Sequence, residues 1–213
     1  MRYRTNDQMM KKYRHCKLAV FLIITFISFS SIIAQNSDRD TWQQPEKIMD
    51  VVGVKAGMII GEAGAGRGYF TFYLSERVGE NGRVYANDIS ERVLKAIEEK
   101  CEKDSIRNIT TIVGEVADPL FPEKKLDMVV MMRAFHDFTK PVEWMENVIP
   151  SMKAGSSLVI IDLDPDRAGE GWHHFMTKEE VLATMAKTDF EMVRIETFLQ
   201  KDNIYIYKLS DEQ

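Results

Sequence analysis

The stretch "IIGEAGAGRGYF", residues 59 to 70, decides which fold to expect of this chain. An apolar run typical of a buried strand ends in Glu62, and glycines follow at positions 64, 66 and 68. A glycine-rich turn between a strand and a helix lets a ligand approach the backbone closely, and it exposes amide groups at the start of the helix. The stretch therefore predicts a ligand-binding turn at the end of a strand.

The spacing of the glycines narrows the kind of ligand. A dinucleotide site has the pattern G-x-G-x-x-G, whereas this turn reads G-x-G-x-G, and Tyr69 stands where the third glycine would fall. An acid at position 62 would repel a pyrophosphate but would attract an ammonium or sulfonium group. A cationic, nucleoside-like ligand is favoured over a nicotinamide dinucleotide.

The rest of the chain alternates strand-like and helix-like segments. Such alternation predicts a doubly wound, mainly parallel α/β sheet with helices on both faces, closed by a hairpin that adds an antiparallel strand. Ser90 is expected to cap one helix, and the sequence from Thr177 to Glu180 predicts a capping box at another. The expected strands are 57–63, 82–89, 108–115, 126–135, 156–163, 191–199 and 203–209, and the expected helices are 69–79, a segment after residue 90, 141–152 and a segment after residue 177.

Acidic residues stand at the ends of three successive predicted strands. Besides Glu62, Asp88 ends the second strand and Glu115 follows the third. Open α/β sheets bind ligands in the crevice at the carboxyl ends of their strands, so these acids are expected to line one crevice. Asp88 could accept hydrogen bonds from both hydroxyls of a ribose, and Glu115 would lie near the edge of an adenine.

These segments, together with "LDMVVMMRAFHDF" (126–138) and "SMKAGSSLVIIDL" (151–163), resemble the class I S-adenosylmethionine-dependent methyltransferases, in particular the branch that acts on small molecules. The resemblance covers about residues 42–209. It implies a Rossmann-like seven-stranded sheet in the order 3-2-1-4-5-7-6 with an antiparallel seventh strand. It also implies an enzyme that transfers a methyl group from S-adenosyl-L-methionine to a small-molecule acceptor.

The resemblance further implies a set of cofactor-binding residues. The turn would cradle the methionine part, Asp88 and Ile89 would meet the ribose and adenine, and the end of the fourth strand would offer backbone groups to the amino acid part. The full set is Glu62, Ala63, Gly64, Ala65, Gly66, Gly68, Asp88, Ile89, Glu115, Val116, Arg133 and Ala134. The sequence departs from the family at Glu62, where aspartate is usual, and at "KAGS" (153–156), where Lys-Pro-Gly-Gly is usual.

The acceptor side is less well defined. Methyl transfer is an in-line displacement in which positioning and exclusion of water do much of the work, and a base is needed only if the acceptor must lose a proton. His136 is the candidate base or acceptor-positioning group, although a loop histidine bonded to backbone is the alternative. The candidate substrate-binding residues are Tyr69, His136, Trp172, His173 and His174, and the alternative for each is a core or surface position. No group of cysteines and histidines has the spacing of a zinc site, so no metal is expected.

The N-terminal part has a different character. Residues 1–17 are basic and residues 18–34, "LAVFLIITFISFSSIIA", carry no charge, which is the pattern of a signal peptide or an N-terminal membrane anchor. We expect residues 35–41 to be a linker and residues 42–213 to form the methyltransferase domain, exported to the periplasm or anchored outside the cytoplasm, with this segment as its only membrane contact.

Charge and rival functions complete the expectations. The whole chain has a formal charge of −5 although its first 17 residues are basic, so the body is strongly acidic and a poor match for nucleic acid. Two alternatives stay open at this point. One is an exported protein on the same fold that binds S-adenosylmethionine or a nucleoside without catalysis, and the other is a nucleotide-dependent dehydrogenase, which the glycine spacing disfavours.

Overall fold

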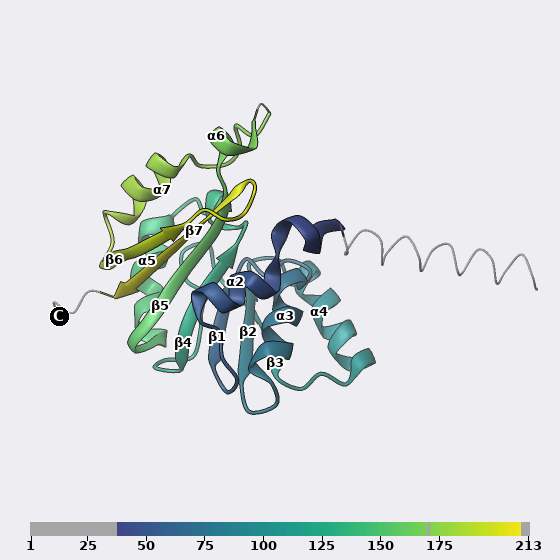
Figure 1. The fold of residues 1–213 in the computed structure, drawn as a ribbon. Helices are drawn as coiled ribbons and strands as arrows, with labels where there is room; N and C mark the ends of the chain where they lie inside the picture. The colour runs from purple at the N-terminus through teal and green to yellow at the C-terminus, as the bar shows by residue number, and fades with distance from the viewer. Residues whose placement is uncertain (1–37, 170, 210–213) are drawn as a thin grey trace, which may run out of the picture. The chain divides into compact units, whose positions relative to one another are not determined.

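The structure of the protein is a computed structural model that describes residues 38–169 and 171–209 (Figure 1). The chain divides into two compact units, residues 1–44 and 45–213. In the part of the first unit that is described, residues 38–43 are helical.

The predicted signal peptide or anchor, residues 1–34, lies outside the described residues. Among the helices that are described, none combines the length and the apolar character needed to cross a membrane. The division into a leader, a linker at 35–41 and a domain from 42 onward therefore stays a prediction.

The second unit is built on one seven-stranded sheet. The strands lie in the order β3-β2-β1-β4-β5-β7-β6, and β7 runs antiparallel to both of its neighbours. Both the order and the antiparallel strand confirm the prediction. The strands are β1 (Ile59–Ala63), β2 (Arg83–Asp88), β3 (Ile109–Val113), β4 (Leu126–Met132), β5 (Met152–Leu163), β6 (Phe190–Glu196) and β7 (Asp202–Leu209).

Helices cover both faces of this sheet (Figure 1). On one face, α2 and α3 pack on the side chains of alternate residues of the central strands, and α4 packs beside α3 over β2 and β3. On the other face, α5 and α7 pack on the intervening residues. The helical elements are α2 (Pro45–Val52), α3 (Tyr69–Val78), α4 (Glu91–Asp104), η1 (Phe135–Asp137), α5 (Pro141–Val148), η2 (Ile149–Ser151), α6 (Pro165–Ala168) and α7 (Lys178–Met185).

The central strands are buried on both faces, which explains their continuous apolar sequences. Six of the seven residues of β4 are buried, and so are the last six of β5. Because neighbouring residues point to opposite faces, Val129 and Met131 pack with α5 and α7, whereas Met128 and Val130 pack with α2 and α3.

Of three local expectations, two differ from the structure and one is confirmed. The helix expected at 141–152 ends at Val148 and continues as the 3₁₀ turn η2, because Pro150 has no amide proton to continue the α-helical pattern. Ser90 occupies the N-cap position of α4, but its side chain makes no capping hydrogen bond. The capping box at α7 is present as predicted, with Thr177 and Glu180 each bonded to the other's backbone amide.

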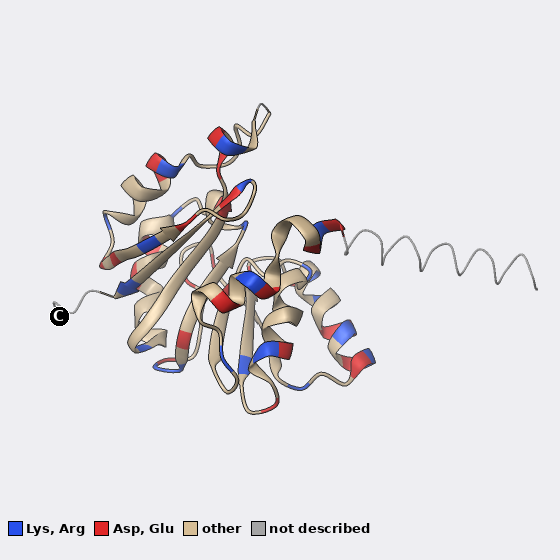
Figure 2. Ribbon diagram, viewed as in Figure 1, with Lys and Arg blue, Asp and Glu red and all other residues tan. Residues whose placement is uncertain are grey.

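Charges of both signs are mixed along the helices, as Figure 2 shows for α2 and α4. On α4, Lys100 pairs with Asp104 one turn away at 2.6 Å, and Lys95 pairs with Glu91 at 3.2 Å. Such exposed pairs contribute little to stability. That the protein does not bind nucleic acid stays a prediction.

Candidate functional site

A cleft of about 440 Å³ opens at the carboxyl ends of the strands. It lies where the strand order reverses between β1 and β4, which is the place where open α/β sheets bind ligands. Its volume falls within the range of small-molecule sites. The residues that line it are Gly64, Gly66, Asn87, Asp88, Ile89, Glu115, Val116, Arg133, Ala134, Asp137, Phe138, Thr139 and Trp144.

The glycine turn after β1 forms one wall of this cleft. Its three glycines all have positive φ angles, of 71°, 56° and 88° along the chain. At Gly64 a Cβ would also collide with the Cβ of Ala134 at the end of β4, so the two chain segments touch only because this residue is a glycine. At Gly66 a Cβ would meet nothing, which leaves the backbone of the turn open to a ligand.

The carboxylate of Asp88 fixes the shape of this turn. One oxygen accepts a hydrogen bond from the amide of Gly66 at 3.0 Å, and the other accepts one from the amide of Ser90 at 2.9 Å. The second bond fixes the backbone of the residue that precedes α4. Each carboxylate oxygen keeps a further lone pair, so Asp88 can hold the turn and still accept hydroxyl groups from a ligand in the cleft.

Asn87 supports the adjoining wall from below. Its side chain is buried, and its amide nitrogen donates to the carbonyl of Pro119 at 2.8 Å, which ties β2 to the loop between β3 and β4. Gly114 in that loop lies against the same amide, where a Cβ would collide with it. The loop then turns tightly, with the amide of Glu115 donating to the carbonyl of Asp118 at 2.7 Å. This brings Glu115 to the cleft.

Two apolar side chains stand at this wall of the cleft with large exposed areas. Ile89 is 63% exposed and Val116 is 51% exposed, although most side chains of this size in the chain are buried. Ile89 directly follows β2, and Val116 lies in the loop after the neighbouring strand β3. An apolar ring placed between them would cover hydrophobic surface that now faces water.

Glu62 lies beneath the turn. It is 2% exposed and is absent from the cleft lining, and its carboxylate accepts a hydrogen bond from the hydroxyl of Thr71 on α3 at 2.5 Å. The contact ties the end of β1 to the helix that the turn introduces. Whether this acid also meets the ammonium group of a ligand stays a prediction. Ala63, Ala65 and Gly68 are likewise absent from the lining.

The chain leaves β4 through an unusual residue. Arg133 has a φ angle of +53°, and its amide donates to the carbonyl of Ile161 at 2.7 Å, so the sheet ladder continues to the point where the chain turns away. Its guanidinium binds the buried carboxylate of Asp202 on β7, with the closest contact at 2.6 Å. With the amide engaged, the backbone contribution of this residue to a ligand is limited to its carbonyl oxygen. Ala134 follows and contacts the glycine turn.

His136 lies just beyond this turn in a polar cluster. Its side chain is 5% exposed, and its Nδ1 lies 2.9 Å from both oxygens of Asp162 at the end of β5. Its Nε2 points to Asp137, whose nearest oxygen is 3.5 Å away. The Nε2 of His174 lies 2.8 Å from the other oxygen of Asp137. The ring of Phe175 packs on His136 with 4.0 Å between centroids.

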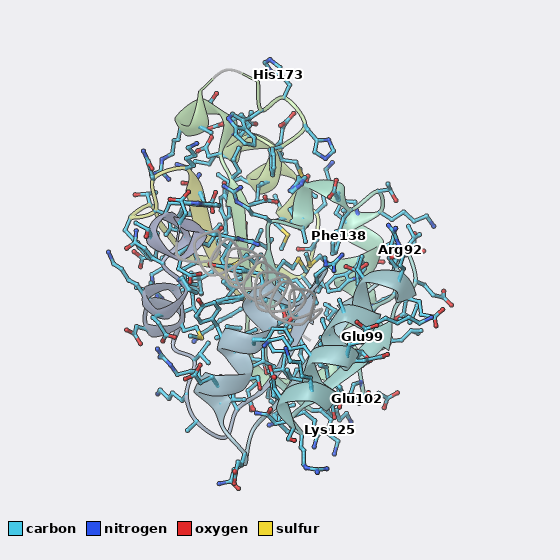
Figure 3. All side chains as sticks on the ribbon, turned by 90° about the vertical axis from the view of Figure 1, so that its right-hand side faces the viewer. Arg92, Glu99, Glu102, Lys125, Phe138 and His173 are labelled. Carbon is cyan, nitrogen blue, oxygen red and sulfur yellow. The ribbon has the colours of Figure 1, made fainter. Side chains whose placement is uncertain are left out.

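None of the five predicted substrate residues lines the cleft. Tyr69 packs against Tyr73 and the α2–α3 core, and Trp172 packs against Phe175. His173 is exposed at the tip of its loop, well apart from Phe138, as Figure 3 shows. His136 and His174 do not line the cleft, but both lie close to Asp137, which does line it. Direct contact of these five residues with an acceptor stays a prediction.

Sequence reasoning missed several lining residues. Asn87 precedes the predicted Asp88 in a strand, and its inward direction follows only from the pairing of β2 with β3. Phe138, Thr139 and Trp144 follow the "AFHD" segment, and an aromatic residue at such a position is equally typical of a core. The signal that could have found Phe138 and Thr139 is their place in the connection that follows the fourth strand.

Comparisons with known proteins agree with this geometry. The methyltransferase domain family matches residues 54–210. A crystal structure of a SAM-dependent methyltransferase from Aquifex aeolicus has 26% sequence identity and a TM-score of 0.74, covering 79% of this chain and 91% of that one.

Two curated relatives match over shorter regions. Nocamycin O-methyltransferase of Saccharothrix syringae is 31% identical over 83 residues, which is 39% of this chain and 30% of the relative. Demethylmenaquinone methyltransferase of Lactococcus lactis subsp. lactis (strain IL1403) is 27% identical over 124 residues, which is 58% of this chain and 48% of the relative. The matched part thus spans less than half the length of these relatives.

The fold and the cleft define the class of protein. The sheet order, the antiparallel β7 and the glycine turn with its acid at the end of β2 are those of the class I S-adenosylmethionine-dependent methyltransferases. The chain belongs to the methyltransferase domain family, which confirms the resemblance seen in its sequence.

Proposed function

We propose that this protein transfers a methyl group from S-adenosylmethionine to a small-molecule acceptor. The observation that supports the proposal most strongly is the hydrogen bond from the amide of Gly66 to the carboxylate of Asp88, which lies in the cleft where the strand order reverses. It places an acid where the ribose of the cofactor would lie and an open backbone where the methionine part would lie. Bound S-adenosylmethionine supplies an activated methyl group, and the protein supplies its position.

The residues of the cleft fit such a cofactor. Asp88 and Glu115 offer acceptors for the hydroxyl and amino groups of an adenosine, and Ile89 and Val116 offer apolar contacts for its ring. The space above Gly66 admits a ligand against the backbone. Asp88 and Glu115 disfavour a pyrophosphate, which would bring two negative charges close to these acidic side chains.

The opposite end of the cleft suits an apolar, ring-containing acceptor. Phe138 and Trp144 line it with their rings 5.1 Å apart in an edge-to-face arrangement, and Thr139 and Asp137 add polar groups. Aromatic walls with a few polar groups are typical of small-molecule sites. The names of the two curated relatives, a nocamycin O-methyltransferase and a demethylmenaquinone methyltransferase, support an acceptor of this kind.

His136 is proposed to assist the acceptor indirectly. Its imidazole is held by Asp162 and directed at Asp137, so any proton that it takes from a ligand in the cleft would pass through or beside that carboxylate. On this proposal, His136→Ala slows turnover and leaves cofactor affinity unchanged. An unchanged rate with every acceptor that is turned over would assign the histidine a structural role.

Calorimetric titration of the full chain with S-adenosylmethionine, S-adenosylhomocysteine and NAD tests the cofactor assignment. Binding of the first two without NAD supports it, and no binding of either rejects it. Transfer of a labelled methyl group to a panel of phenols, quinols and hydroxylated polyketides then tests catalysis. Cofactor binding without transfer to any member of a broad panel would favour a non-catalytic binding protein on the same fold.

We also propose, from the sequence of residues 1–34 alone, that the domain lies outside the cytoplasm. The basic stretch followed by 17 uncharged residues supports export or anchoring. Fractionation of cells that produce the full chain, followed by protease treatment of intact spheroplasts, tests this. Domain that stays protected inside the spheroplasts would reject the proposal.

A further inference from the structure

The fold brings two histidines and an aspartate together although their sequence spacing predicts no metal site. His136 and Asp137 come from η1 at the end of β4, and His174 comes from the loop before α7. A ring nitrogen of each histidine and a carboxylate oxygen all lie within 4.8 Å of one another. Two imidazoles and a carboxylate are a ligand set that suits divalent transition metals.

The ring of His136 is already oriented as a metal ligand would be. Asp162 is 2% exposed, and it accepts hydrogen bonds from the backbone amides of His136 and Leu163 at 3.0 and 2.9 Å. A carboxylate held in this way can accept a hydrogen bond from Nδ1–H of the ring, and in that tautomer Nε2 keeps its lone pair. A histidine ligand whose second nitrogen donates to a carboxylate is the usual arrangement around bound metals, because it fixes the ring and raises its basicity.

The lone pair of Nε2 then faces a negatively charged partner. Asp137 places one oxygen 3.5 Å from Nε2 of His136, a separation that two ligand atoms of one metal ion can have. The second oxygen of Asp137 lies 2.8 Å from His174, so both histidines converge on the same carboxylate. Phe175 packs on the His136 ring and restricts its rotation.

Access and position agree with a metal site. The side chains of His174 and Asp137 are 70% and 62% exposed, so an ion can reach the cluster from solvent, whereas His136 forms its buried side. Three protein ligands leave at least one coordination position open, as in catalytic rather than structural zinc sites. Asp137 also lines the cleft, so an ion held here would lie at the border of the acceptor end.

We propose that His136, Asp137 and His174 bind one divalent transition metal ion, of which Zn²⁺ is the best match, and that Asp162 positions His136 for it. The proposal concerns metal binding and does not require methyl transfer, although an ion on Nε2 would exclude the proton-accepting role proposed for His136 above. It can therefore fail while the cofactor assignment holds, and the reverse is also possible.

The test uses the neighbouring histidines of the "GWHHF" segment as a matched pair. Full-length protein without a histidine tag is stripped with a chelator and titrated with Zn²⁺ in competition with a colorimetric chelator. We expect one ion per chain, loss of this binding in His174→Ala and Asp137→Asn, and full retention in His173→Ala. Co²⁺ should give visible absorption bands that the His174→Ala variant lacks.

Asp162→Asn tests the positioning role. We expect it to weaken Zn²⁺ binding about 10- to 100-fold, as loss of such outer partners usually does, while the histidine and aspartate ligands remain. Because Asp162 is buried, its variant is compared only if its circular dichroism matches the unaltered protein. The exposed pair His173 and His174 carries the test in any case. No saturable binding, or equal binding in the His173→Ala and His174→Ala variants, would overturn the proposal.

Discussion

Replacement of Asp88 by alanine tests the cofactor site most directly, because this carboxylate has two separable tasks. It accepts the amide of Gly66 at 3.0 Å and the amide of Ser90 at 2.9 Å, and it offers its remaining lone pairs to the cleft. Removing charge-assisted hydrogen bonds to a ligand costs about 1–3 kcal/mol. At 1.4 kcal/mol for each factor of ten, the dissociation constant for S-adenosylmethionine should rise roughly 5- to 150-fold.

The same substitution should affect folding only slightly. The two amides released from Asp88 lie at a half-buried position, so water can replace the lost acceptor. Hydrogen bonds to a charged carboxylate are worth about 1.5–3 kcal/mol each, and at this half-buried position solvation of the released amides returns most of that. At about 2–4 °C for each kcal/mol in a chain of this size, the melting temperature should fall by only a few degrees.

Calorimetry on three variants separates the causes. Asp88→Asn keeps the volume but turns an N–H group toward one of the two amides, so it should also weaken binding. Asp104→Ala makes the same chemical change at the exposed end of α4, where the acid pairs only with Lys100, and should leave the affinity unchanged. A dissociation constant for Asp88→Ala within twofold of the unaltered protein would refute the assignment of this residue to the cofactor.

Three further outcomes are expected. Gly64→Ala, with a left-handed backbone and a collision with Ala134, should lower the free energy of unfolding by about 1–3 kcal/mol in urea titrations; an unchanged midpoint would contradict the close approach. Arg167→Ala should lower the free energy of unfolding by about 2–3 kcal/mol in the same assay, because its guanidinium binds three backbone carbonyls and a side-chain amide of the β6–β7 hairpin. A decrease under about 0.5 kcal/mol, which is typical of a surface substitution, would argue against this role. Burial raises the pKa of Tyr205 to about 12, so the stability that the neutral side chain contributes is complete below about pH 10 and is lost as the pH rises through 12. Tyr205→Phe should therefore flatten the fall in the urea midpoint between these pH values. An equal fall in both proteins would refute this role of Tyr205.

The parts of the fold that follow from sequence are those set by local rules. The buried strands around the glycine turn can be recognised as unbroken apolar runs, and the capping box at Thr177 predicts the start of α7. The glycine turn and Asp88 could be placed in one crevice because parallel strands all end at the same edge of the sheet. These positions need no knowledge of which side chains meet.

The acceptor end could not be predicted in the same way, since its geometry depends on contacts between distant segments. His136 is oriented by Asp162, 26 residues later in the chain, and meets His174 only because the loop before α7 returns over the end of β4. The positive φ angle of Arg133 turns the chain at the end of β4. An arginine rarely adopts such an angle, so its residue type does not predict the turn. Glu62 is the reverse case, where the residue was recognised but its bond to Thr71 was not.

Asp137 connects the two sites, because it lines the cleft and also faces both histidines. A ligand that binds its carboxylate changes the charge that an ion in the histidine cluster would meet, and an ion there changes the charge that the ligand would meet. Thermodynamic linkage requires the two effects on binding free energy to be equal. An acceptor that donates a hydroxyl to Asp137 would therefore bind with an affinity that depends on Zn²⁺, whereas the affinity for a cofactor held by Asp88 and Glu115 should depend on it much less.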